Sequence, residues 1–127
     1  MKTRVFVYVG SVILAIAAIF AMAISIQEPA TVNVDILPDS AIQGQDEYLS
    51  PKTIKVVIGV NNTVRWNNID NTSHTLTPDH MSDGFSTSIG LLKPGESEER
   101  TFEIPGVYDY HGTPGPWITG TIIVEEQ

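Results

Sequence analysis

The sequence predicts an all-β domain, a sandwich or a barrel, that follows one apolar N-terminal segment. After residue 27, apolar residues recur with the period of two that is typical of strands, and no sustained helical period is present. Turn-forming pairs such as Pro38-Asp39 and Pro105-Gly106 separate these stretches. Residues 5–26, in contrast, run without a single charge. Two regions of different character are therefore expected.

The apolar segment is long enough to cross a bilayer. About 22 residues would span roughly 33 Å as a helix, and the preceding residues 1–4 carry two basic side chains. The prediction is a transmembrane anchor over 1–26, a linker over 27–31 and a domain over 32–127. The protein is expected to cross the cell membrane once, with the domain on the extracytoplasmic side. A cleavable signal peptide is the alternative, since residues 21–23 (AMA) fit a small-x-small cleavage site. Both interpretations export the domain.

Short strands are expected along the exported domain. Their predicted ranges are 32–36, 54–58, 64–66, 101–104, 107–110 and 122–124. Residues 38–50 are polar and are expected to form a loop or a short irregular insertion. We expect one domain without internal repeats.

Charge and cysteine content exclude several classes of function. From residue 27 onward the chain has fifteen acidic and five basic residues, a formal charge of −10. Such a surface argues against nucleic acid or anionic lipid as a partner and is compatible with a basic protein partner. The 127 residues contain no cysteine, so thiolate nucleophiles, iron–sulfur clusters and thiolate-bound copper are excluded.

Four linked segments carry a family resemblance. They read VRWNNIDNTSHTLT at 64–77, GLLKPGES at 90–97, PGVYDY at 105–110 and PWITGTIIV at 116–124. Together they resemble the plastocyanin- and halocyanin-type cupredoxins over most of residues 50–126. The resemblance implies a Greek-key β-sandwich, with copper binding and electron transfer as the ancestral activity.

The resemblance also implies where a copper ligand set should lie. In the family, an upstream His and a hairpin with a Cys, a His and a weak axial Met form the type 1 centre. Here the upstream position is His74, whereas the hairpin positions are Gly112, Gly115 and Ile118. Three of the four ligands are missing, so the family's type 1 centre cannot form.

The remaining candidate metal ligands are His74, His80 and His111. Imidazoles without a thiolate suit a copper site that is not type 1, or zinc, and Asp79, Met81 and Asp83 are additional potential ligands near His80. On a regular strand His111 points away from the position of residue 112, unless a bulge turns it inward. The alternative is three ordinary histidines, no cofactor and a lost site.

The sequence thus leaves two hypotheses for function. The first is a membrane-anchored, extracytoplasmic cupredoxin-like domain with a His-centred copper site or a lost site. The second is a metal-free binding module, or an accessory subunit of a membrane protein complex, in which Tyr110 and Trp117 either pack or dock a partner. The expected partners are the membrane, through the N-terminal helix, and a protein or membrane redox complex. Neither nucleic acid binding nor enzymatic activity is expected, because no pair of carboxylates or other catalytic set can be named.

Overall fold

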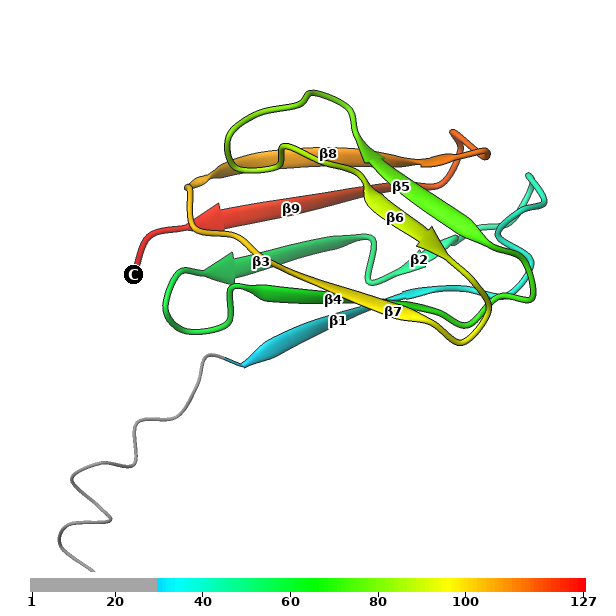
Figure 1. The fold of residues 1–127 in the computed structure, drawn as a ribbon, viewed down its shortest axis with the longest axis horizontal. Helices are drawn as coiled ribbons and strands as arrows, with labels where there is room; N and C mark the ends of the chain where they lie inside the picture. The colour runs from blue at the N-terminus through cyan, green and yellow to red at the C-terminus, as the bar shows by residue number, and fades with distance from the viewer. Residues whose placement is uncertain (1–29) are drawn as a thin grey trace, which may run out of the picture.

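The computed structural model describes residues 30–127, which form a sandwich of two β-sheets (Figure 1). The strands are β1 (Thr31–Ile36), β2 (Leu49–Ser50), β3 (Thr53–Val57), β4 (Thr63–Asn68), β5 (His74–Pro78), β6 (Ile89–Leu92), β7 (Ser97–Thr101), β8 (Gly106–Thr113) and β9 (Thr119–Glu125). One sheet has the order β2-β1-β4-β7 and the other β3-β9-β8-β5-β6. The predicted all-β sandwich is confirmed.

Both sheets are mixed. The pairs β1·β4 and β3·β9 are parallel, and the other pairs are antiparallel. In β1, β4 and β9 buried residues alternate with more exposed ones, the pattern of a strand with one face on the core. The parallel pairing of β1 with β4 sets Thr31 beside Thr63 and Ile36 beside Asn68. The chain therefore enters at one end of the sandwich, and the β4–β5 turn lies at the other (Figure 1).

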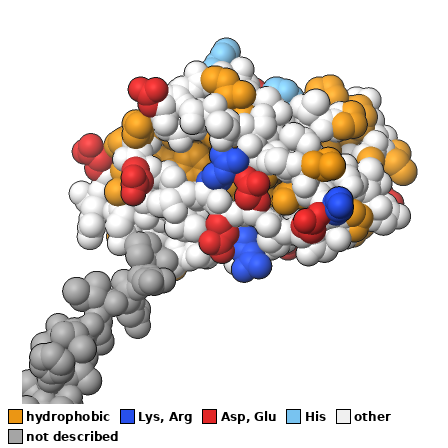
Figure 2. Space-filling model, viewed as in Figure 1, with side chains coloured by type: hydrophobic (Ala, Val, Ile, Leu, Met, Phe, Trp, Pro, Cys, Tyr) orange, Lys and Arg blue, Asp and Glu red, His pale blue; other side chains and the backbone are white. Residues whose placement is uncertain are grey.

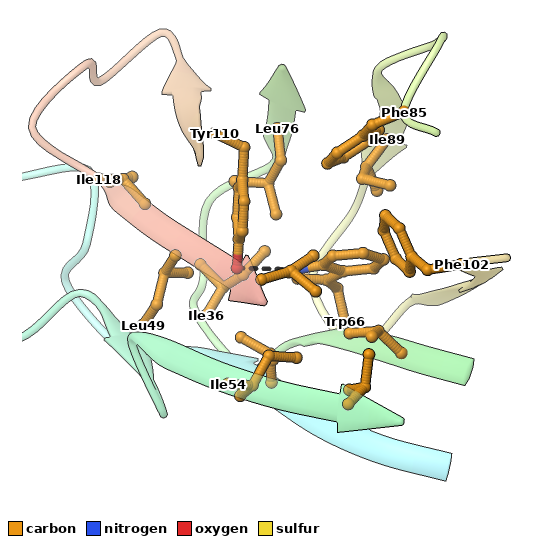
Figure 3. Packing of buried hydrophobic residues seen from close by; sticks show 14 of the residues in the cluster. Ile36, Leu49, Ile54, Trp66, Leu76, Phe85, Ile89, Phe102, Tyr110 and Ile118 are labelled. Carbon is orange, nitrogen blue, oxygen red and sulfur yellow. Dashed lines mark hydrogen bonds between the residues drawn. The ribbon is translucent and has the colours of Figure 1, made fainter. Parts of the chain in front are cut away.

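An aromatic cluster fills the core between the sheets (Figure 3). The Trp66 ring packs edge-to-face on Tyr110, with ring centroids 5.9 Å apart, and its Nε1–H donates to the Tyr110 hydroxyl over 3.1 Å. Burial raises the pKa of Tyr110 to about 12, and the hydrogen bond from Trp66 offsets only part of that rise. Phe85 and Phe102 continue the cluster with centroids 5.3 Å apart. The cluster connects the two sheets, and Tyr110 belongs to it rather than to an exposed patch.

One predicted strand is misplaced. The sequence predicts a strand over 101–104, but β7 ends at Thr101. The backbone N–H and C=O of Phe102 bond to the Asn62 carbonyl and side-chain amide, and the Phe102 ring turns into the core. After this the chain leaves the sheet and Ile104 is exposed. The alternation at 101–104 reflects one buried ring and the turn that follows it.

Three strands had no counterpart in the sequence prediction: β2, β5 and β6. The predicted loop over 38–50 is present up to β2. This loop folds back over the β4–β5 end of the sandwich, where the Ser40 carbonyl accepts a hydrogen bond, 2.9 Å long, from the Trp117 Nε1–H. Within residues 30–127 no helix is long and apolar enough to cross a bilayer. The predicted anchor over 1–26 lies outside the described residues.

Candidate functional site

The candidate site is at the β4–β5 end of the sandwich, where His74 starts β5. The His74 side chain is 2% exposed, and its Nε2 lies 2.6 Å from the Asp70 Oδ2. Asp70 is itself buried, four residues earlier in the turn after β4. A carboxylate on one ring nitrogen orients the imidazole and leaves the other nitrogen, Nδ1, to interact elsewhere.

Asp70 connects three segments of the chain. Its Oδ1 accepts hydrogen bonds from the backbone N–H groups of Asp39 and Asn71, each 2.8 Å long. Burial by itself raises the pKa of Asp70. The hydrogen bond from His74, the two backbone N–H donors and the charge of a protonated His74 outweigh burial, and the pKa lies below its ordinary value. Asp70 is therefore a buried carboxylate that the native fold holds in its ionised form.

The open side of the His74 ring faces a small hollow of about 50 Å³. No hydrogen bond within residues 30–127 uses the His74 Nδ1, and no buried side-chain nitrogen or oxygen in that range lacks a partner. The Nδ1 atom is therefore accessible from this hollow. Its lining residues are Ala41, Thr72, Ser73, Pro114, Gly115 and Trp117.

The chain is 31% identical over 91 residues to amicyanin from Paracoccus denitrificans, an alignment that covers 68% of this chain and 67% of amicyanin. The chain belongs to the cupredoxin family. No protein-family profile matches the sequence.

Solved cupredoxin structures share the fold. The purple cupredoxin from Nitrosopumilus maritimus superposes with a TM-score of 0.65 and 25% identity, over 74% of this chain and 99% of that one. The Cu(I) form of an amicyanin variant gives a TM-score of 0.58 and 25% identity, over 80% of this chain and 87% of the other. A copper-containing nitrite reductase from Thermus scotoductus matches at 23% identity over 24% of its length, which is a likeness of fold alone.

The residues that the family resemblance sets at the copper position, Gly112, Gly115 and Ile118, do not fit a type 1 ion, because none of them is a Cys, His or Met. A Cβ added at Gly112 would lie 2.8 Å from the Gly115 carbonyl oxygen and 3.1 Å from the Cβ of Ile118. Gly115 has a φ of +105°, which residues with a side chain rarely adopt. Ile118 is fully buried, so an aliphatic side chain occupies the position that the resemblance gives to the axial ligand. These three positions therefore carry no thiolate, imidazole or thioether, and there is little room for a side chain at Gly112.

The structure does not bring the three predicted histidines together. His74 points into the sandwich, whereas His111 lies on the outer face of β8, where its Nδ1 is 2.6 Å from the Asp79 Oδ1. No bulge turns His111 inward, because β8 pairs regularly with β5 from Tyr110 to Thr113. His80 borders a different groove, beside Gly106 and Val107 at the start of β8. Among residues 30–127 no three His, Cys, Asp or Glu side chains are grouped to hold a metal ion.

The sequence analysis did not identify Asp70 as the partner of His74, and although it placed Ile118 at the axial position, it did not predict that this side chain packs between Gly112 and Gly115. The signal for Asp70 was its spacing, since a carboxylate four residues before a His can meet it across a tight turn. The buried environment of Ile118 depends on contacts with Gly112 and Gly115 that no spacing shows.

Proposed function

We propose that this cupredoxin is a membrane-anchored, extracytoplasmic docking module whose type 1 copper site is lost. The observation that carries the proposal is the packing of Ile118 against Gly112 and Gly115. An aliphatic side chain in the centre of the loop supplies no ligand and stabilises the hairpin without a metal. The end of the sandwich formed by the β4–β5 turn and the β8–β9 hairpin, called the loop end below, is then a surface for contacts instead of a redox centre.

Exposed apolar side chains around this end support a docking role. Ile42, Ile69 and Leu91 are 64%, 51% and 62% exposed. Ile69 belongs to the β4–β5 turn, Ile42 to the loop that covers it, and Leu91 adjoins Leu92, which pairs with His74. Trp117 lines the hollow beside His74 and is half-buried against the core. Large apolar side chains that gather on one surface mark a contact with another protein.

The position of this end suits a partner that approaches from the side away from the membrane. The described chain begins next to Thr31, and β1 carries the backbone about 17 Å toward the opposite end of the sandwich (Figure 1). With residues 5–26 in the bilayer, the apolar loop end faces outward. We therefore propose an accessory subunit of a membrane protein complex, with no enzymatic activity of its own.

The accessible His74 Nδ1 favours a second candidate, a copper ion held by one imidazole. In that case His74 would be the first ligand, and His80 or His111 would have to move or be replaced by solvent ligands. Copper bound in this way would lack the intense absorption near about 600 nm, because that band needs a thiolate.

A metal titration of the full chain in detergent distinguishes the two candidates. The docking module predicts that Cu²⁺ and Zn²⁺ leave the melting temperature unchanged at neutral pH. A His74 site predicts a stabilisation of about 2.7 kcal/mol at a hundredfold excess over Kd, and this effect should weaken in acid because a metal ion binds only the unprotonated imidazole. Electron paramagnetic resonance gives the copper coordination. A rise that persists in His80→Ala and His111→Ala, but not in His74→Gln, would overturn the docking-module proposal and assign the metal to His74.

A further inference from the structure

A second surface lies at the other end of β8, away from the candidate site. It is a groove of about 400 Å³ between the β5–β6 loop, which supplies His80 and Asp83, and the start of β8. The opposite wall consists of Ile104, Val107 and Asp109. Gly112 is five residues further along β8, about 17 Å away. The groove is therefore separate from the loop end.

The floor and rim of the groove are apolar. Val107 is 65% exposed and Ile104 45%. Met81, between the lining residues His80 and Ser82, is 58% exposed. Figure 2 shows hydrophobic side chains at the surface on this side of the molecule, with acidic side chains around them. A sheet surface open to water normally carries polar residues at such positions, so these side chains indicate an interface.

The charges around the groove are negative. Asp83 and Asp109 line it, Glu103 is adjacent to Ile104, and no Lys or Arg is among the lining residues. The Asp109 Oδ1 accepts a hydrogen bond from the Thr121 hydroxyl, 2.6 Å long. In the described chain, no hydrogen bond or ion pair uses the Asp83 carboxylate. The groove thus offers a carboxylate that is free to meet a cation.

The backbone of β8 is also open here. The ladder between β5 and β8 ends with the hydrogen bond from the Asp79 N–H to the Asp109 carbonyl, 2.9 Å long, after which the chain turns away into the β5–β6 loop. Hydrogen-bonding directions alternate along an antiparallel strand. The Asp109 carbonyl points toward β5, whereas the Gly112 N–H points the other way, toward Ile118 on the β9 side. Val107 is two residues before Asp109, so its N–H and C=O also point toward β5. No strand of the described chain continues beside Val107 on that side.

We propose that this groove binds an extended, basic segment of a partner protein. The segment would pair with the free backbone of Val107 and place an apolar side chain on Val107 and Ile104. A Lys or Arg two positions away on the same face would reach Asp83 or Asp109, because alternate side chains of an extended chain share a face. Main-chain pairing gives affinity in such complexes, and the side-chain pattern gives specificity.

The test is an amide-resolved NMR titration of the full chain in detergent. The probe is a short blocked peptide with a leucine and an arginine two positions apart, and the matched peptide has glutamate in place of arginine. We expect saturable shifts at the amides of Gly84, Gly106 and Val107 with the arginine peptide alone. Asp83→Asn should weaken binding about tenfold, the effect of one charge-assisted contact, and Val107→Ser should weaken it as well.

Asp46→Asn is the matched control for loss of one negative charge, because Asp46 is exposed in the β1–β2 loop, and it should bind like the unmutated chain. Thermal melts of each variant verify that it is folded. Three results would overturn the proposal: no saturable shift, equal binding of the glutamate peptide, or shifts centred on Ser73, His74 and Trp117. The third result would instead assign the peptide to the loop end.

Discussion

Two histidine–aspartate pairs of the same length lie in different surroundings. The His74–Asp70 and His111–Asp79 contacts both measure 2.6 Å. The side chains of the first pair are 2% and 1% exposed, and those of the second are 33% and 42% exposed. Asp70 also accepts two backbone hydrogen bonds, whereas the second pair only connects the outer face of β8 to the residue after β5.

The difference shows that the length of a contact alone does not indicate how much the contact stabilises the fold. A buried pair leaves a strongly unfavourable charge or polar group behind when one partner is removed. Two exposed partners are solvated by water when they separate, so their pairing contributes little. In this cupredoxin the His at the ligand position is thus part of a structural network that holds the β1–β2 loop, the β4–β5 turn and β5 together.

The largest expected effect is on stability, and it separates the two pairs directly. Asp70→Ala should lower the free energy of unfolding by about 3–5 kcal/mol, because it leaves His74 and two backbone N–H groups without their acceptor. Asp79→Ala should cost less than about 1 kcal/mol. Denaturant unfolding of both variants measures the difference. Equal costs would show that burial does not distinguish the pairs.

A smaller effect is expected on the pH dependence of stability. The pKa of Asp70 is lower in the folded chain than its ordinary value of 3.8, so the folded state holds fewer protons there than the unfolded state. The resulting stabilisation is present above that value and is lost as the pH falls through the folded pKa. The unmutated chain should therefore lose stability more steeply below about pH 4 than Asp70→Asn does. Urea unfolding between neutral and acid pH compares the slopes, and parallel curves would contradict the prediction.

The contrast between the pairs also explains what the sequence could and could not predict. The two-residue period predicts β1, β4, β8 and β9, because each has one face on the core. It misses β5 and β6, where His74 and Gly90 interrupt an apolar pattern. The family resemblance identifies the position of His74, but the placement of its partner Asp70 depends on two other contacts. The Asn68 side chain accepts a hydrogen bond from the Asp70 N–H, and the Asp39 N–H, from a distant part of the sequence, donates to the Asp70 carboxylate. The four-residue spacing of Asp70 and His74 permits their contact, but periodicity and spacing do not determine the turn that brings the two side chains together.

The smallest expected effect concerns salt, and it applies a double-mutant cycle to each pair. Screening acts strongly on exposed charges, since the Debye length falls from about 10 Å at 0.1 M salt to about 3 Å at 1 M. The coupling energy of Asp79 with His111, from the single and double alanine variants, should therefore be a few tenths of a kcal/mol at low salt and near zero in 1 M NaCl. The coupling of Asp70 with His74 should change little, because water and ions do not reach between two side chains that are 1% and 2% exposed. Unfolding titrations at the two salt concentrations give both values. A salt-independent coupling for the exposed pair would mean that a hydrogen bond, rather than charge, holds His111 on Asp79, and the distinction between the pairs would then rest on burial of the partners alone.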